Sequence, residues 1–200
     1  MSTTYTPLRY PGGKSALSSY VKSILLENDL VGGHYVEPYA GGAGLALALL
    51  YNNYVSDIHL NDLNIAVHNF WYIALHHNEE LCNLIEQTDV SIVEWHKQKE
   101  QYAQPVEDNR LAHAFATFFL NRTNRSGILS AGVIGGKEQN GNYKLDARYN
   151  KKTLIRKLKQ LFAHRDQIHL YNLDAADLIV NTLNDLPERT LIYFDPPYYV

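Results

Sequence analysis

The chain has 200 residues, of which 46% are hydrophobic and 20% charged, and its formal net charge at pH 7 is −3. This composition predicts a soluble protein with one substantial core, and the slight acidity excludes a uniformly basic nucleic-acid coat, so that contacts with phosphates have to come from a local patch. The polar first residues and the lack of a long apolar run favour a cytoplasmic location. The lone Cys82 excludes a disulfide framework within the chain, and the spacing of the histidines predicts no metal site.

The first part of the chain has the pattern of a helix followed by a strand, a helix and a second strand. Apolar residues at helical spacing predict a helix within Ser15–Glu27, and the run from His34 to Glu37 predicts a strand that stops at Pro38 and a glycine cluster. The apolar run from Leu45 to Leu50 favours a helix, and Val55 to Leu60 predicts the second strand. Together these segments predict one βαβ unit.

Between residues 69 and 165 the pattern changes to several helical segments, which indicates a helical insertion. Its apolar stretch runs from Leu111 to Leu120, and a loop rich in glycine and asparagine follows from Gly127 to Tyr143. Lys151 to Arg165 contains six basic and no acidic residues, with leucines at helical spacing. We therefore expect an amphipathic basic helix at the end of the insertion.

Strand signals return at Ile168 to Leu173 and at Thr190 to Phe194. Alternating strands and helices predict an α/β fold with a mainly parallel sheet, whose ligands bind at the carboxyl ends of the strands. The unusual motifs of this sequence all fall at these predicted ends.

The most informative motif is Asp195-Pro196-Pro197-Tyr198, directly after the last predicted strand. It combines a carboxylate, a rigid backbone carbonyl and an aromatic face, which suit a flat amine such as the exocyclic amino group of adenine. If the Asp195 carboxylate and the Pro196 carbonyl both accept from that group, they concentrate its lone pair toward an electrophilic methyl while Tyr198 stacks on the base. The base would have to be flipped out of a duplex. A plain proline turn at a strand end is the alternative.

Here the sequence resembles the Dam-like adenine-N6 DNA methyltransferases whose motifs have the α order. The chain stops just after the tetrapeptide. Four other segments also resemble motifs of this family and follow in the family's order: Arg9 to Lys14, Val36 to Gly44, Leu60 to Asn64, and Asn121 to Thr123 with Ser126-Gly127. The resemblance covers essentially the whole chain. It implies an incomplete Rossmann-like methyltransferase sheet of about four strands in residues 1–68 and 166–200, with a helical DNA-recognition insertion in residues 69–165.

The resemblance also implies the reaction, which is site-specific methyl transfer from S-adenosylmethionine to adenine N6 in double-stranded DNA, without a metal, as in restriction–modification enzymes. Asp62 would bind the cofactor ribose, Lys14 its carboxylate and Gly41 its methionine part, although Asp174 could equally be a helix cap. The implied cofactor-binding residues are Tyr10, Lys14, Glu37, Tyr39, Gly41, Asp62, Asp174 and Asp195. Tyr39 and Ala43 depart from the family's phenylalanine and glycine, which leaves the backbone contacts of this turn open.

A nicotinamide dinucleotide site is a weaker interpretation of the same glycines. Gly42, Gly44 and Asp62 imitate its fingerprint, but Leu47 stands where the third glycine belongs. That interpretation also leaves the tetrapeptide unexplained.

Phosphate contacts with DNA are expected from basic residues of the insertion, because neutralised phosphates supply much of the affinity for DNA. The candidates are Arg122, Arg125, Lys152, Arg156 and Lys159. A merely solvated basic face is the alternative for the last three.

Three further expectations concern the chain as a whole. An edge strand before the tetrapeptide favours self-association through the exposed sheet edge and poor activity of the chain alone. A catalytically incomplete remnant that only binds DNA or S-adenosylmethionine is the competing class. RNA is an alternative substrate, since the tetrapeptide does not fix the polymer.

Overall fold

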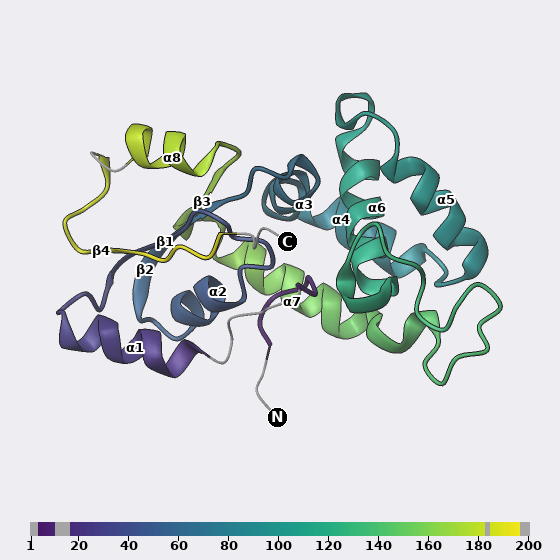
Figure 1. Ribbon diagram of the computed structural model, residues 1–200, viewed down its shortest axis with the longest axis horizontal. Helices are drawn as coiled ribbons and strands as arrows, with labels where there is room; N and C mark the ends of the chain where they lie inside the picture. The colour runs from purple at the N-terminus through teal and green to yellow at the C-terminus, as the bar shows by residue number, and fades with distance from the viewer. Residues whose placement is uncertain (1–3, 11–16, 183–184, 197–200) are drawn as a thin grey trace. The chain divides into compact units, whose positions relative to one another are not determined.

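A computed structural model of the chain describes residues 4–10, 17–182 and 185–196 (Figure 1). Its contacts divide the chain into two compact units. The first consists of Met1–Thr6, Gly12–His68 and His164–Val200, and the second of Pro7–Pro11 and Asn69–Ala163.

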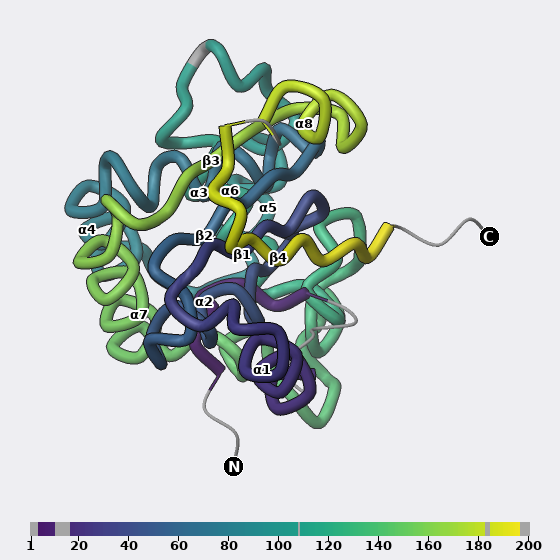
Figure 2. Tube along the Cα trace, turned by 90° about the vertical axis from the view of Figure 1, so that its left-hand side faces the viewer, coloured from purple at the N-terminus to yellow at the C-terminus, as the bar shows by residue number. Residues whose placement is uncertain are grey.

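The first unit is built on a parallel sheet. Its strands are β1 (Gly33–Glu37), β2 (Val55–Asn61), β3 (Ile168–Tyr171) and β4 (Thr190–Ile192), in the order β3-β2-β1-β4 (Figure 2). Each neighbouring pair is parallel. The chain therefore runs outward from β1 to β3 and then returns to the other side of β1, which makes the carboxyl ends of β1 and β4 the topological switch point of the sheet. Ligands of open α/β sheets bind at such a point.

Helices cover both faces of this sheet (Figure 1). α1 (Ser18–Glu27) and α2 (Gly44–Tyr51) lie on one face, and α2 is so apolar that every residue from Leu45 to Leu50 is buried. α8 (Ala175–Thr182) lies on the other face, where Leu178 borders a small gap that β1 and β4 also line. The apolar run that predicted a helix thus becomes the main packing layer of the sheet.

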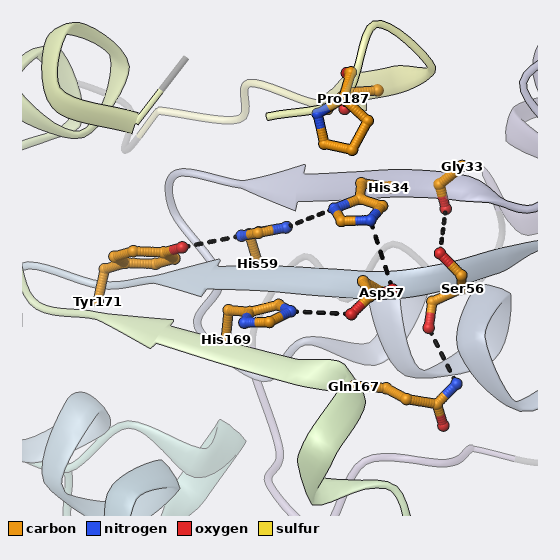
Figure 3. A network of polar contacts seen from close by, with 10 residues as sticks. Gly33, His34, Ser56, Asp57, His59, Gln167, His169, Tyr171 and Pro187 are labelled. Carbon is orange, nitrogen blue, oxygen red and sulfur yellow. Dashed lines mark hydrogen bonds and ion pairs between the residues drawn. The ribbon is translucent and has the colours of Figure 1, made fainter. Parts of the chain in front are cut away.

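The α8 side of the sheet carries a polar array of histidines (Figure 3). His34 Nδ1 lies 3.0 Å from His59 Nε2, and His59 Nδ1 lies 2.9 Å from the Tyr171 hydroxyl. His169 and His34 both approach the Asp57 carboxylate, at 2.9 and 3.4 Å. Burial, with the nearby His169 and His34, lowers the pKa of His59 to about 4. The array joins β1, β2 and β3 side by side.

The second unit is helical. The boundary between the units falls within α3 (Ile65–His76), and the unit continues through α4 (Asn78–Gln87), α5 (Ile92–Tyr102), α6 (Arg110–Thr123) and α7 (Lys151–Ala163). Buried aromatic rings form its core, because Phe118 lies against both Phe70 and Tyr149, at centroid distances of 5.8 and 5.6 Å. Short 3-10 turns at Val106–Asp108, Arg125–Gly127 and Leu145–Arg148 connect the helices.

Several elements are shorter than the sequence predicts. The basic helix ends at Ala163, and Arg165–Gln167 form a separate 3-10 turn before β3. β3 ends at Tyr171, and the backbone amide of Leu173 donates to the side chain of Asn61 rather than to a backbone carbonyl of β2. β4 ends at Ile192, although Tyr193 N still donates to Val36 O at 2.9 Å.

Within the described ranges, no helix combines the length and the apolar character needed to cross a membrane.

Candidate functional site

The candidate site lies at the carboxyl edge of the sheet, at the switch point. β1 ends at Glu37 and leads through Pro38 to Gly41, whose φ of 48° is a left-handed conformation that glycine adopts readily. β2 ends at Asn61, directly before Asp62. Parallel strands end at the same edge, which brings the glycine turn and the acidic residue of two sequence motifs together.

Asp62 is the centre of this arrangement. Its Oδ2 accepts a hydrogen bond from Gly41 N, and its Oδ1 accepts one from Asn64 N, each at 2.9 Å. An ionised carboxylate accepts hydrogen bonds at about four positions, and ribose hydroxyls are donors of the kind that it can bind. The two backbone hydrogen bonds thus fix the orientation of the half-buried Asp62 carboxylate.

Two asparagines that the sequence motifs did not single out hold the loops around Asp62. The buried Asn61 donates to Pro38 O and Leu173 O, at 2.9 and 3.0 Å, and so joins the turns that follow β1 and β3. Asn172 donates to Asp62 O at 2.7 Å. The sequence signal that could have identified them is an asparagine at or just after the end of each of two neighbouring strands. At such a position one side-chain amide can form hydrogen bonds with the backbones of two loops.

Glu37 is buried with only 1% of its surface exposed, at the end of β1. Its Oε1 accepts from the Tyr35 hydroxyl at 3.1 Å. Burial, and next the Glu37 carboxylate, raise the pKa of Tyr35 well above its ordinary value, so Tyr35 stays a neutral donor. Tyr39 is half-buried two residues further on. Glu37 is therefore positioned by a tyrosine of its own strand.

Asp195 and Pro196 follow β4. Because Tyr193 N bonds to Val36 O, the chain stays beside β1 after β4 ends and carries Asp195 toward the same carboxyl edge as Gly41 and Asp62. Asp195 is half-buried and Pro196 is exposed. Tyr198 and Lys14 lie outside the described residues.

Two other predicted cofactor residues have different surroundings. Asp174 Oδ1 accepts from Ala176 N at 2.8 Å, and its carbonyl accepts from Leu178 N, which is a capping arrangement at the start of α8. Tyr10 belongs to the second unit, where 51% of its surface is exposed. The cap contact satisfies helical amides and accounts for Asp174 without a ligand.

The predicted phosphate contacts fall into two groups. Arg122 is engaged by the backbone: its Nε donates to Arg148 O at 2.7 Å, its Nη2 donates to the same carbonyl, and its Nη1 donates to Pro7 O at 3.5 Å. Burial, and next the nearby Arg9, lower the pKa of Arg122 to about 10. Arg125, by contrast, is exposed. Arg122 thus has a fixed role inside the unit, while Arg125 is open to solvent.

The three predicted phosphate contacts on α7 share its outer face. Leu154, Leu158 and Leu161 are buried on the inner face. The exposed cations are Lys152, Arg156 and Lys159. The periodicity of the sequence predicted this separation, and the helix presents three positive charges to solvent.

No group of three or more histidine, cysteine, aspartate or glutamate side chains in the described part of the chain is arranged to hold a metal ion. The histidine array of the sheet is bonded internally instead, ring to ring and ring to Asp57.

Comparison with known proteins identifies the family of the chain. No curated protein matches the chain. The model of the family described as "D12 class N6 adenine-specific DNA methyltransferase" matches residues 10–200. That range includes the glycine turn, Asp62, the helical unit and the tetrapeptide that begins at Asp195. With a parallel α/β sheet and a family match over nearly its whole length, the chain belongs to the D12 class of N6 adenine-specific DNA methyltransferases.

Proposed function

We propose that this chain itself catalyses the reaction of its family, methyl transfer to the N6 atom of adenine in double-stranded DNA, at the carboxyl edge of the sheet. The observation that carries this proposal is the convergence of Gly41, Asp62 and Asp195 at the switch point between β1 and β4. In open α/β sheets a switch point of this kind suits a nucleoside, and here the turn after β4 would supply the acceptors for an amine.

The surroundings of Asp62 fit S-adenosylmethionine, the methyl donor that a methyltransferase family implies. Asp62 would accept from the ribose hydroxyls, and the buried Gly41 lets the backbone approach the methionine part closely. Glu37, Tyr39, Tyr10 and Lys14 complete the proposed cofactor set, with a minor part for Asp174 beside its capping contact. When bound, the positive sulfonium makes the methyl group electrophilic enough for direct transfer.

Asp195 and Pro196 would act on the base. The Asp195 carboxylate and the Pro196 carbonyl each accept a hydrogen bond from the N6 amino group, and Tyr198 stacks on the ring. These bonds favour a tetrahedral nitrogen with a localised lone pair, so they strengthen as the transition state forms. No covalent enzyme intermediate is needed. The pair therefore positions and activates a nucleophile that is otherwise weak.

We assign the helical residues 69–163 to DNA recognition. Arg125 and the outer face of α7 present exposed cations, which suit phosphates of the duplex. Arg122 would act indirectly, since it ties α6 to the carbonyls of Pro7 and Arg148. This arrangement gives an acidic protein a local basic surface.

Transfer of tritiated methyl from S-adenosylmethionine tests the proposal. Unmethylated double-stranded DNA should become labelled at adenine N6, and structured RNA of matched length should not. Labelling of RNA alone would show that the substrate is RNA and not DNA. If the chain binds both S-adenosylmethionine and DNA without labelling either polymer, it is a binding remnant and the proposal is wrong.

We also propose self-association through the outer edge of β4. Among the described residues, β4 pairs only with β1, so its other edge presents backbone donors and acceptors to solvent. Phe194, next to this edge, is 49% exposed. Size-exclusion chromatography with light scattering should find a species of twice the mass of the chain, and a monomer at all concentrations would contradict this.

A further inference from the structure

The side chain of Asn61 continues the sheet beyond the last residue of β2. Its Nδ2 donates to Leu173 O at 3.0 Å, and its Oδ1 accepts from Leu173 N at 2.9 Å. Leu173 lies just after the end of β3, so a side-chain amide here takes the place of the backbone of a neighbouring strand. This closed pair of hydrogen bonds fixes the loop that leads from β3 to α8.

The same residue also holds the glycine turn that follows β1. Asn61 Nδ2 donates to Pro38 O at 2.9 Å, and the main-chain carbonyl of Asn61 accepts from Ala40 N at 2.8 Å. The two hydrogens of the amide thus serve one loop each. Only 1% of Asn61 is exposed, so water is not available to replace these partners. Asn61 therefore sets the spacing between the glycine turn and the loop after β3.

The two loops that Asn61 joins both hold Asp62. Gly41 N, in the glycine turn, donates to Asp62 Oδ2 at 2.9 Å. Asn172 Nδ2, in the loop after β3, donates to Asp62 O at 2.7 Å. One loop therefore orients the carboxylate of Asp62, and the other holds its main chain. A shift of either loop moves the residue that the proposed function gives to the cofactor ribose.

We propose that Asn61 and Asn172 are positioning residues for S-adenosylmethionine, which hold the glycine turn, Asp62 and the loop after β3 in the arrangement that binds the cofactor. The inference rests on the proposed function, because that function puts the cofactor at Asp62. A binding edge that is ordered before its ligand arrives loses less conformational entropy on binding. Without the two amides the cofactor itself has to order these loops, and its affinity falls.

Asn61→Asp tests this role with little change of shape. The carboxylate still accepts from Leu173 N, but it cannot donate, so its oxygen faces the carbonyls of Pro38 and Leu173. Isothermal titration calorimetry on the whole chain should find S-adenosylmethionine binding about tenfold weaker than in the wild type, roughly the factor for one hydrogen bond. In the tritium assay the KM for S-adenosylmethionine should rise while kcat is kept, because the loss lies in binding.

Asn78→Asp is the matched control. Asn78 is a buried asparagine of the helical unit, and its Nδ2 also donates to two carbonyls, those of Ala74 and Leu158, at 2.8 and 3.0 Å. The same substitution should therefore lower the free energy of unfolding to a similar extent at both positions. Only Asn61→Asp should weaken cofactor binding.

A double-mutant cycle with Asp62→Ala separates positioning from a general loss of stability. If Asn61 acts by arranging the edge around Asp62, the two losses of affinity overlap. The double variant should then bind more tightly than the product of the two single losses predicts. Losses that simply multiply would contradict the inference.

Asn172→Ala extends the test to a residue that is only half-buried, so it applies even if Asn61→Asp does not fold. It removes the donor to Asp62 O and should weaken cofactor binding several-fold. Wild-type affinity in Asn61→Asp or in Asn172→Ala would overturn the inference, and so would an equal loss in Asn78→Asp.

The proposed function fails in a different way. A wild-type chain that binds S-adenosylmethionine without methylating DNA would contradict the proposed function alone, because the calorimetric comparison of the variants follows binding and not turnover. A wild-type chain that methylates DNA while the asparagine variants keep its cofactor affinity would contradict only the positioning role. A wild-type chain that binds no S-adenosylmethionine would contradict both.

Discussion

The side chain of Asn121 holds the main chain of Arg9, 112 positions away in the sequence. Asn121 Oδ1 accepts from Arg9 N, and Asn121 Nδ2 donates to Arg9 O, both at 2.7 Å. The same amide donates to Gly127 O at 2.9 Å. Gly127 has a φ of +76°, and a Cβ there would lie 2.5 Å from Arg9 O, so glycine is required for this close approach. Two separate sequence motifs thus form one structural element.

Asn121→Leu should lower the free energy of unfolding by about 2–4 kcal/mol, because each buried polar group left without a partner costs about 1–3 kcal/mol. Urea unfolding followed by circular dichroism measures the change. Asn142→Ala is the matched control, since Asn142 is exposed, and it should stay within about 0.5 kcal/mol of the wild type. Equal stability of the two variants would show that the Arg9 contact is dispensable.

Asp62→Ala should weaken S-adenosylmethionine binding by about 1–3 kcal/mol, the usual cost of losing hydrogen bonds to a charged group. Isothermal titration calorimetry measures it. Asp174→Ala is a useful comparison, because the capping contact of Asp174 accounts for that carboxylate, and its affinity should fall much less. An Asp62→Ala variant that binds as tightly as the wild type would remove Asp62 from the cofactor site.

Asp195→Ala should lower the methylation rate by a factor of about 100 or more while S-adenosylmethionine affinity is largely kept, because the lost contacts act mainly in the transition state. The tritium assay and calorimetry on the same preparation separate the two quantities. A variant that keeps more than about a tenth of the wild-type rate would rule out the role of Asp195.

The histidine array predicts a dependence of stability on pH. The pKa of His59 is lowered to about 4, below its ordinary value of 6.5, so the unfolded chain binds more protons than the folded chain between these two pH values. Stability from neutral His59 is thus complete above about pH 6.5 and is lost as the pH falls toward 4. The groups that face the His59 ring are His34, His169, Asp57 and Tyr171.

Urea midpoints measured from pH 7.5 to 4 follow this effect. His59→Gln should flatten the decline, and His76→Gln should not, since His76 is exposed and lies outside the array. An equally steep decline in His59→Gln would assign the acid sensitivity to other groups.

Replacing Lys152, Arg156 and Lys159 by glutamine should weaken binding to all DNA sequences alike. If each cation contacts one phosphate, the slope of log K against log salt should become less steep by about 2.7, as each contact contributes about 0.9. Fluorescence anisotropy over a range of salt concentrations measures the slope. An unchanged slope would mean that this face of α7 is only solvated.

The sequence determined the local elements and the family. Helical spacing located α1 and α7, apolar stretches located α2 and α6, and apolar runs that end at turn residues located the strands, because these patterns depend on which residues have to be buried along one element. The glycine turn, Asp62 and the tetrapeptide could also be recognised from the sequence alone. Each motif is a short stretch whose chemistry does not depend on distant residues.

Only the tertiary structure decided which distant groups meet. The pairing of β4 with β1 creates the switch point, and Asn61 joins two turns that are far apart in the chain. The sequence predicts Arg122 as a phosphate contact and could not show that its guanidinium donates to the carbonyls of Pro7 and Arg148. Hydrogen bonds between residues far apart in the chain leave no periodic pattern in the sequence. They follow from burial, which requires every enclosed polar group to find a partner wherever the folded chain provides one.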